Sequence, residues 1–260
     1  MHAYEDILGY RLFDIVGSQA IATQQAQPLY PIAVHVLRQN NLLIQLNQSQ
    51  LAAPISELKI SYDGDFPVEF IRSLDEKIKE NAPGVRLKWL QFDRDTALKM
   101  VEEQHIHFAF SPARMNVTPN ENILYKNLGY VDYNVYVGQR SPLLKQSDFT
   151  LVDAQGEEQF ICQHTALAKS VIQEYSAIIK TVACYSLLTE LLQNSGWAMI
   201  PNHIARQAVE RKQITRIKSS VISNSIQVLF SLFYNVTSTR CELSKQCIEW
   251  SDHIALRLFN

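Results

Sequence analysis

The first part of the chain carries a seven-residue spacing of apolar positions. The surrounding stretch is rich in Gln and Asn and poor in charge, and it predicts one long helix over residues 23–50. Pro28 and Pro31 lie in its opening turns, so we expect the regular helix to begin near them. The apolar positions that repeat at this spacing are Leu29, Val36 and Leu43. We interpret them as a dimerisation seam, with packing against the same chain as the alternative.

After Pro54 the pattern changes to short apolar runs that alternate with helical patterns. Runs predicted as strands lie at 58–62, 85–92, 106–110, 134–137, 160–162, 178–183, 197–200 and 226–234. Patterns predicted as helices lie at 66–80, 96–103, 165–175, 186–193, 203–211 and 237–258. Strands that alternate with helices indicate an α/β fold with a parallel sheet and βαβ crossovers. We expect two α/β lobes of about 100 residues each.

Composition and charge exclude several classes of protein. The 260 residues are 47% hydrophobic and carry a formal net charge of -2, which excludes a disordered chain and argues against a nucleic-acid polyelectrolyte. The N-terminus has no basic segment followed by an apolar run, and the longest apolar stretches, such as 226–233, are too short to cross a bilayer. We therefore expect a cytoplasmic protein without a membrane partner.

The cysteines are too few and too widely spaced for a disulfide scaffold. They are Cys162, Cys184, Cys241 and Cys247, and none forms a CxxC pair. We expect reduced, mostly buried thiols. A redox-sensing pair is unsupported, because no basic residue flanks Cys162 or Cys184 to lower a thiol pKa.

An ordered series of short motifs runs through the chain. Residues 8–13 read Leu-Gly-Tyr-Arg-Leu-Phe after Glu5, residues 81–85 read Asn-Ala-Pro-Gly-Val, residues 141–143 read Ser-Pro-Leu, and residues 194–201 read Asn-Ser-Gly-Trp-Ala-Met-Ile-Pro. In this order the motifs resemble those of the LysR-type transcriptional regulators. In that family the first motif ends the recognition helix of a winged helix-turn-helix. The resemblance covers essentially the whole chain.

The resemblance implies a fold and a division into domains. The implied domains are a remnant of the winged helix-turn-helix over 1–22, a linker and dimerisation helix over 23–55, a first regulatory subdomain over 56–130 plus 236–260, and a second over 131–235. The two subdomains would be α/β lobes of the type II periplasmic-binding-protein kind, joined by two crossing strands. A small-molecule effector would bind in the cleft between them.

The resemblance also implies a DNA-binding head, and we expect only a small part of that head in this chain. Residues 3–8 would be the last turn of the recognition helix, and the wing has Ile15 and Ser18 where the family has basic residues. Helix-turn-helix proteins read bases with the first residues of that helix. We therefore expect no specific DNA binding by this chain alone. Promoter DNA would be a partner of the full-length protein only, assembled as a homodimer or tetramer, with RNA polymerase as a further partner.

Ligands of open α/β sheets bind at the carboxyl ends of strands, near helix N-termini. This rule selects the expected effector-binding residues, which are Tyr62, Asp63, Gly64, Asp65, Ser111, Gln163, His164, Thr165, Cys184 and Tyr185. The alternatives are helix caps for Asp63 and Asp65, a surface position for His164, and a wall or core position for Tyr185. The two aspartates would repel an acidic ligand, or they would hold an amine or a sugar hydroxyl.

Other groups of side chains do not indicate catalysis, a metal or a cofactor. His105 and His107 point the same way on a strand, but no third ligand is identifiable. The sequence contains no nucleophile elbow, zinc-protease motif or phosphate-binding glycine loop, so we expect no enzyme. Tyr133, Tyr136 and Trp197 are expected as core aromatics.

The predicted function is the ligand-sensing and dimerising part of a LysR-type DNA-binding transcriptional regulator. The alternatives are a solute-binding protein of the same fold and a headless regulator that acts by competing for dimer partners. An enzyme on the same two-lobed scaffold is the third hypothesis. The lack of an export signal and the wing-like N-terminus weigh against the transport protein.

Overall fold

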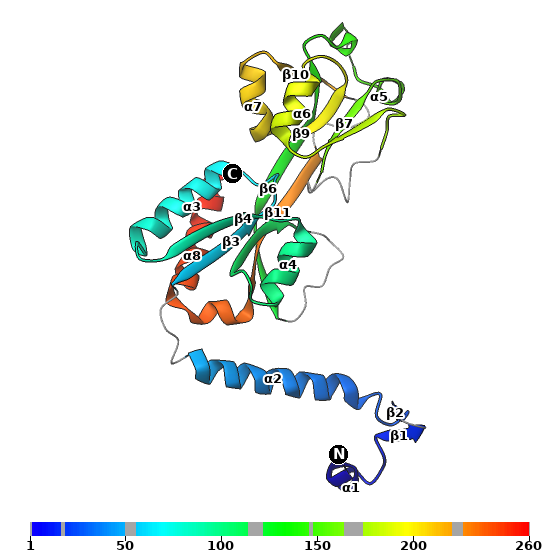
Figure 1. Ribbon diagram of the computed structural model, residues 1–260, viewed down its shortest axis with the longest axis vertical. Coiled ribbons are helices and arrows are strands. Elements are labelled where there is room, and N and C mark those ends of the chain that lie inside the picture. Colours follow the sequence, from blue (N-terminus) through cyan, green and yellow to red (C-terminus); the bar gives the residue numbers. More distant parts are fainter. Residues whose placement is uncertain are drawn as a thin grey trace. The chain divides into compact units, whose positions relative to one another are not determined.

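The computed structural model describes residues 2–16, 19–49, 56–113, 122–145, 148–163, 174–219 and 226–259. The chain divides into an N-terminal unit, Met1–Pro54, and a C-terminal unit, Ile55–Asn260 (Figure 1). Each unit has its own internal packing. No helix of the described residues is long and apolar enough to cross a membrane.

The N-terminal unit consists of a short helix, a hairpin and a long helix. Helix α1 (His2–Leu8) is followed by β1 (Phe13–Val16), which pairs antiparallel with β2 (Gln19–Ala22). Helix α2 (Leu29–Ser49) begins directly after Pro28. This agrees with the expectation that the regular helix begins near Pro28 and Pro31. Residues 23–28 form turns instead, in which the Ala26 N–H bonds to the Thr23 carbonyl.

Helix α2 exposes apolar side chains along its first half. Val36 is 59% exposed and Leu29 is partly exposed, whereas the side chain of Leu43 lies outside the described residues. Further exposed apolar side chains of this helix are Tyr30, Ile32 and Leu37. Within this unit nothing described covers them, and the dimerisation seam stays a prediction.

The C-terminal unit is built on a mixed sheet with the strand order β4-β3-β5-β11-β6-β9-β7-β8, and β10 pairs with β6. The strands are β3 (Glu57–Tyr62), β4 (Arg86–Gln91), β5 (Phe108–Pro112), β6 (Ile123–Gly138), β7 (Gln159–Cys162), β8 (Ile179–Val182), β9 (Trp197–Pro201), β10 (Ile214–Arg216) and β11 (Ile226–Asn235). The helices are α3 (Val68–Asn81), α4 (Arg94–Glu102), α5 (Leu151–Gly156), α6 (Tyr185–Leu192), α7 (Asn202–Glu210) and α8 (Glu242–Leu258), with short 3-10 helices at Pro142–Lys145 and Val236–Arg240.

Two α/β lobes share this sheet. In the first lobe β3 pairs parallel with β4 and β5, and in the second lobe β7 pairs parallel with β8 and β9. Strands β6 and β11 pair antiparallel with each other and run between the lobes (Figure 1). The expectation of a parallel sheet is therefore confirmed within each lobe and wrong for β6 and β11. These two strands carry the chain from one lobe to the other and back, so they run in opposite directions.

Several predicted elements differ from the observed ones. Strand β6 is much longer than the predicted 134–137. Its first half was missed because it is largely exposed and has no regular alternation of apolar and polar residues. Helix α5 and strand β10 were missed because both are short. Most of the predicted helix 165–175 lies outside the described residues, but Tyr175 is not helical, and its N–H donates to Gln159 Oε1 over 3.0 Å. The predicted helix 237–258 begins as a 3-10 helix, and α8 follows it.

The largest hydrophobic core extends through both lobes. In the first lobe the Phe66 ring stacks on Phe110 with centroids 4.8 Å apart. The same core continues along β6 through Tyr133 to Trp197 of the second lobe. Tyr133, Tyr136 and Trp197 are all buried, which confirms their prediction as core aromatics.

Candidate functional site

The turn after β3 carries the first group of predicted site residues. Asp63 and Asp65 are buried, with 1% and 0% of their surface exposed. The Asp63 N–H donates to the Phe110 carbonyl over 2.9 Å, and the Asp65 N–H donates to Asp63 Oδ1 over 3.1 Å. Neither side chain caps α3, which has no side-chain cap, so the alternative of a helix cap is wrong. The first bond holds the turn against the carboxyl end of β5.

The other two residues of this turn face strand β4. The Tyr62 ring packs edge-on against Trp89 with centroids 6.5 Å apart. A Cβ added to Gly64 would lie 2.9 Å from Gln91 Nε2, closer than side-chain carbons normally approach. Gly64 thus allows the Gln91 side chain to lie over the turn.

Asp65 interacts with tyrosines of two other segments. Tyr133 of β6 donates its hydroxyl to Asp65 Oδ2 over 2.6 Å, inside the protein. Burial and the charge of Asp65 hold the pKa of Tyr185 well above its usual value. Tyr185 begins α6 in the second lobe. We call these three residues the Asp65 cluster. It brings together residues of the first lobe, a crossing strand and the second lobe.

Two thiols lie beside the Asp65 cluster and differ in environment. Burial, followed by the charges of Asp65, Cys184 and Asp63, raises the pKa of Cys162 to about 12. Cys184 is exposed, and its Sγ lies 3.2 Å from the Ser186 hydroxyl. That hydrogen bond, together with the Leu187 N–H, lowers the pKa of Cys184. The Ser186 hydroxyl and the backbone N–H groups at the start of α6 thus lower the thiol pKa, although no basic residue flanks Cys184.

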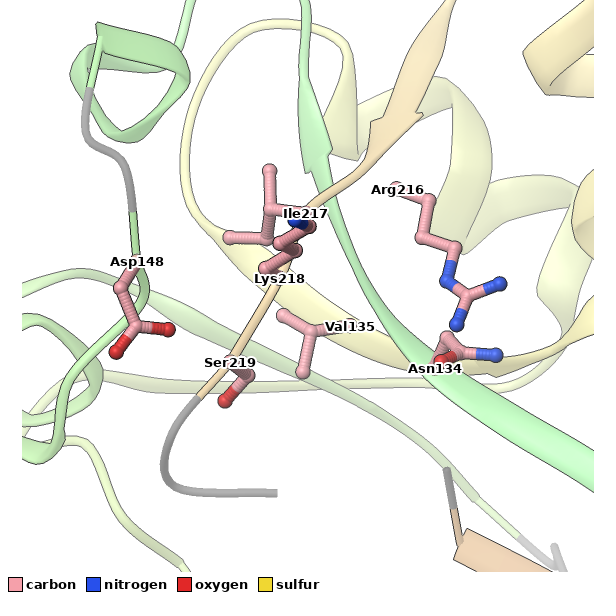
Figure 2. A pocket seen from close by; sticks show the side chains of 7 residues that line it. All are labelled: Asn134, Val135, Asp148, Arg216, Ile217, Lys218 and Ser219. Atoms are coloured by element: carbon pink, nitrogen blue, oxygen red, sulfur yellow. The ribbon is translucent and has the colours of Figure 1, made fainter. Parts of the chain in front are cut away.

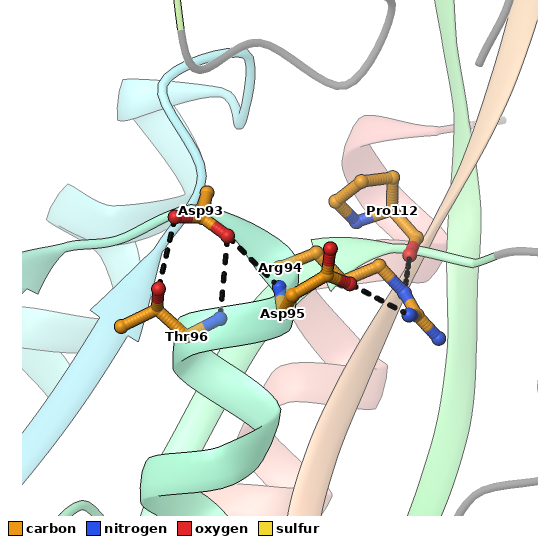
Figure 3. A network of polar contacts seen from close by, with 5 residues as sticks. All are labelled: Asp93, Arg94, Asp95, Thr96 and Pro112. Atoms are coloured by element: carbon orange, nitrogen blue, oxygen red, sulfur yellow. Dashed lines mark hydrogen bonds and ion pairs between the residues drawn. The ribbon is translucent and has the colours of Figure 1, made fainter. Parts of the chain in front are cut away.

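Ser111 lies at the end of β5, opposite Ser231 of β11. It is fully buried, and its Oγ has no hydrogen-bond partner among the described residues. Arg94 holds the next residue, because its Nε donates to the Pro112 carbonyl over 2.8 Å (Figure 3). Asp93 caps α4 by accepting from the N–H groups of Asp95 and Thr96, which orients Arg94 at the start of that helix.

The remaining predicted residues come from the end of β7. Gln163 is exposed, and its N–H donates to the Val182 carbonyl over 2.7 Å. His164 and Thr165 lie outside the described residues. Five of the predicted residues lie close enough for their charges to affect one another's pKa values, namely Asp63, Asp65, Cys162, Cys184 and Tyr185. Their role in effector binding stays a prediction.

The sequence prediction missed polar residues at the end of β9. Asn202 Oδ1 accepts from Asn134 Nδ2 over 2.6 Å and from the Tyr136 hydroxyl over 2.9 Å. The next residue, His203, is partly buried, and its Nε2 has no partner among the residues described. β9 is parallel to β7, so the same rule about the carboxyl ends of strands would have selected Asn202 and His203. Tyr133 was missed because its context is apolar and its one polar contact is distant in sequence.

A cavity of about 650 Å³ lies beside β6 in the second lobe (Figure 2). Its lining residues are Asn134, Val135, Asp148, Arg216, Ile217, Lys218 and Ser219. None of them belongs to the Asp65 cluster. A volume of this size lies within the usual range for small-molecule sites.

Metal binding finds no support among the described residues, which contain no group of three or more His, Cys, Asp or Glu side chains placed for a metal. His107 instead accepts the Lys59 N–H at Nδ1 over 3.1 Å, and burial lowers its pKa. His105 is exposed and lies beside Glu103. The two histidines thus have separate structural contacts.

His203 should make the protein less stable at acidic pH. Burial is the main cause that lowers its pKa to about 4, with nearby Arg206 acting in the same direction and Glu69 opposing it. The unfolded chain would bind a proton at this histidine between pH 6.5 and about 4, whereas the folded chain would not. The free energy of unfolding should therefore fall as the pH drops through this window, by at most about 3 kcal/mol.

Urea denaturation at several pH values measures this loss. His203→Gln should reduce the loss between pH 7 and 4, while His253→Gln, at an exposed histidine of α8, should leave it unchanged. Equal pH dependence in the wild type and His203→Gln would contradict the assignment to His203.

Cys184 should be the first of the described thiols to react with iodoacetamide at neutral pH. Its pKa is lowered, whereas burial raises the pKa of both Cys162 and Cys247 to about 12 and leaves little thiolate there. Mass spectrometry of tryptic peptides after short exposure gives the order of modification. Ser186→Ala should slow the reaction at Cys184 alone. Faster labelling of Cys162 would show that the buried thiol opens readily to solvent.

Sequence comparison identifies no relatives, since no family model and no curated protein matches the chain. Comparison with solved structures identifies similar proteins. The regulatory domain of MetR, a LysR family regulator from N. meningitidis, superposes with a TM-score of 0.62 at 12% identity, over 78% of this chain and 96% of that domain. Probable transcriptional regulator PA0477 from Pseudomonas aeruginosa superposes with a TM-score of 0.60 at 18% identity, over 97% of this chain and 85% of its own.

Full-length OxyR from Pseudomonas aeruginosa is similar over 100% of this chain and 84% of its own, with a TM-score of 0.61 at 14% identity. This similarity includes both the N-terminal unit and the two lobes. The chain has the fold of the LysR-family regulators, with α/β lobes of the type II periplasmic-binding-protein kind.

Proposed function

We propose that this chain is the ligand-sensing and dimerising part of a LysR-type DNA-binding transcriptional regulator of the cytoplasm, with the effector bound between its two lobes. The observation that supports this best is the Asp65 cluster. The rule about the carboxyl ends of strands selected Asp65 after β3 and Tyr185 at the start of α6, and these two residues interact there. The solved structures with the same fold include MetR and OxyR regulators, which supports a regulatory role over an enzymatic one.

The Asp65 cluster explains how ligand binding would change the arrangement of the two lobes. Asp65 comes from the first lobe, Tyr185 from the second, and Tyr133 from a strand that runs between them. A ligand that enters this position has to rearrange these side chains and the hydrogen bond between Tyr133 and Asp65. Binding would then favour one lobe arrangement over another by its difference in affinity for the two. The full-length protein would transmit this bias to its DNA-binding head.

Helix α2 supports the dimerising role. Its exposed apolar positions include Val36 at 59% and Leu37 at 62%. A long helix with few charges gains little stability alone, so a second copy of the same helix is a suitable cover. We propose a homodimer or tetramer, with promoter DNA as a partner of the full-length protein and RNA polymerase as a further partner.

A thermal-shift screen of the full chain tests the sensing role. The panel contains small carboxylic acids, amines, amino acids, sugars and aromatics. A specific ligand at 100 times its dissociation constant should stabilise the protein by about 2.7 kcal/mol. A hit should also protect Cys184 from iodoacetamide, because Cys184 lies beside the Asp65 cluster. A stabilising ligand that leaves Cys184 labelling unchanged would place its site elsewhere and count against the proposed cleft.

A further inference from the structure

The two strands that run between the lobes are supported by different third strands. In the first lobe β5 pairs with β11 over residues 230–234, and in the second lobe β9 pairs with β6 over residues 133–137. Between these positions, residues 131–132 of β6 pair with residues 227–228 of β11 (Figure 1). No third strand among those that the structure describes borders this two-stranded segment, which we call the ribbon. Because two strands alone are only marginally stable, the ribbon is easier to deform than the sheet within either lobe.

A β-bulge lies on the first-lobe side of the ribbon. Phe230 of β11 is opposite Gly129 of β6, whereas Ser231 is opposite Asn127, so Leu128 is an extra residue in β6. A bulge bends its strand and increases the local twist. The Ser231 hydroxyl donates to Asn127 Oδ1 over 2.8 Å, which holds the two strands together on the first-lobe side of the bulge. The regular ladder is thus interrupted where the ribbon leaves the first lobe.

The aromatic side chain that follows α8 lies against this bulge. A Cβ added to Gly129 would lie 2.3 Å from Phe259 Cβ and 2.4 Å from its Cγ, so only glycine allows Phe259 to approach β6 this closely. The same ring is tilted against Phe66 and Phe70 of the first lobe, with centroids 6.4 and 6.3 Å apart. The Phe259 N–H donates to the Ala255 carbonyl over 2.9 Å, which fixes the residue to the end of α8.

We propose that Phe259 is a wedge at the hinge between the two lobes and that it holds the ribbon in one arrangement. Its ring is anchored in the aromatic core of the first lobe and contacts β6 where that strand enters the ribbon. A rotation of the second lobe turns the ribbon against this ring, so the ring has to shift before the lobe arrangement changes. The inference concerns the two-lobed fold and does not depend on the effector site proposed above.

Double electron–electron resonance spectroscopy of the full chain, without a ligand, tests the proposal by measuring the distance between the lobes. Spin labels are placed at the exposed positions Glu76→Cys of α3 and Gln207→Cys of α7, in a chain that also carries Cys184→Ser and Cys241→Ser. An excess of unlabelled protein removes the distances between copies. This parent chain should give one distance maximum. Phe259→Ala should add a second maximum that holds at least about 10% of the molecules.

Further variants separate the wedge from a general loss of packing. Leu258→Ala removes a neighbouring side chain that is 38% exposed, and it should leave the distance between the lobes unchanged. Gly129→Ala keeps Phe259 but places a methyl group where its side chain lies, so it should produce the same second maximum as Phe259→Ala. The two changes combined should add nothing to Phe259→Ala alone, because both act on the same contact.

A second pair of labels, Glu76→Cys with Lys99→Cys of α4, reports on the first lobe alone and should give the same distance in every variant. The proposal is overturned if Phe259→Ala keeps the single maximum of the parent chain or if Leu258→Ala gives the same second maximum. It is also overturned if the distance within the first lobe changes, since the ring would then support that lobe rather than the hinge. Circular dichroism confirms that each variant is folded.

Discussion

Replacement of Trp197 by alanine should lower the free energy of unfolding by about 3–5 kcal/mol. Trp197 is 0% exposed and lies in β9 between β6 and β7. Its ring packs against Phe149 with centroids 5.1 Å apart, and its Nε1–H donates to the Ala154 carbonyl over 3.2 Å. Alanine removes these contacts and leaves a cavity that the surrounding strands cannot fill without losing their register.

Two other tryptophan variants control for this effect. Trp197→Phe keeps an aromatic ring and should cost clearly less than alanine, since it loses one hydrogen bond and part of the volume. Trp250→Ala removes a partly buried ring from α8 and should also cost less. Urea denaturation followed by far-UV circular dichroism gives all three values. A loss below about 1 kcal/mol for Trp197→Ala would mean that Trp197 is not enclosed as described.

Replacement of Asp65 by alanine should cost about 1–3 kcal/mol and abolish the response to an effector. The substitution leaves the buried Tyr133 hydroxyl without its acceptor, which is the cost of one unpaired buried group. It also removes the carboxylate that holds Tyr133 and lies beside Tyr185, on which the proposed sensing mechanism depends. The measurements are urea denaturation and the thermal shift produced by whichever ligand the screen identifies.

Asp65→Asn is the matched control, because its amide oxygen still accepts one hydrogen bond. It should retain more stability than the alanine variant. A spectroscopic readout separates the charge of Asp65 from simple packing. Burial and then that charge raise the pKa of Tyr133 and Tyr185, so both variants should form tyrosinate at lower pH than the wild type. Tyrosine ionisation that is identical in all three proteins would contradict the Asp65 cluster.

Sequence reasoning located most elements of the two lobes but not their boundaries. Strands such as β3 and β9 were recognisable because apolar residues fill them and turn residues follow. Strand β6 was recognised only over its last residues, since its first half is largely exposed and lacks a regular alternation of apolar and polar residues. The two prolines indicated where the regular helix α2 begins, and local turns at residues 23–28 satisfy the backbone before it.

Part of the candidate site was also predictable. The rule that ligands bind at the carboxyl ends of strands selected Asp63, Asp65 and Tyr185, which the structure places near one another. The same rule was not applied to β9, so Asn202 and His203 were missed. Tyr133 was assigned to the core, which is confirmed, but its hydroxyl also binds Asp65.

The sequence by itself determined the alternation of strands and helices, the apolar repeat of α2 and the order of motifs along the chain, because each depends on neighbours a few residues apart. Only the tertiary structure decided that Tyr133 and Asp65, 68 positions apart, share a hydrogen bond. It also decided that Asp148 and Arg216 line one cavity. The physical reason is that such contacts are made when a mixed sheet joins distant segments, and the strand order that joins them leaves no local pattern in the residues.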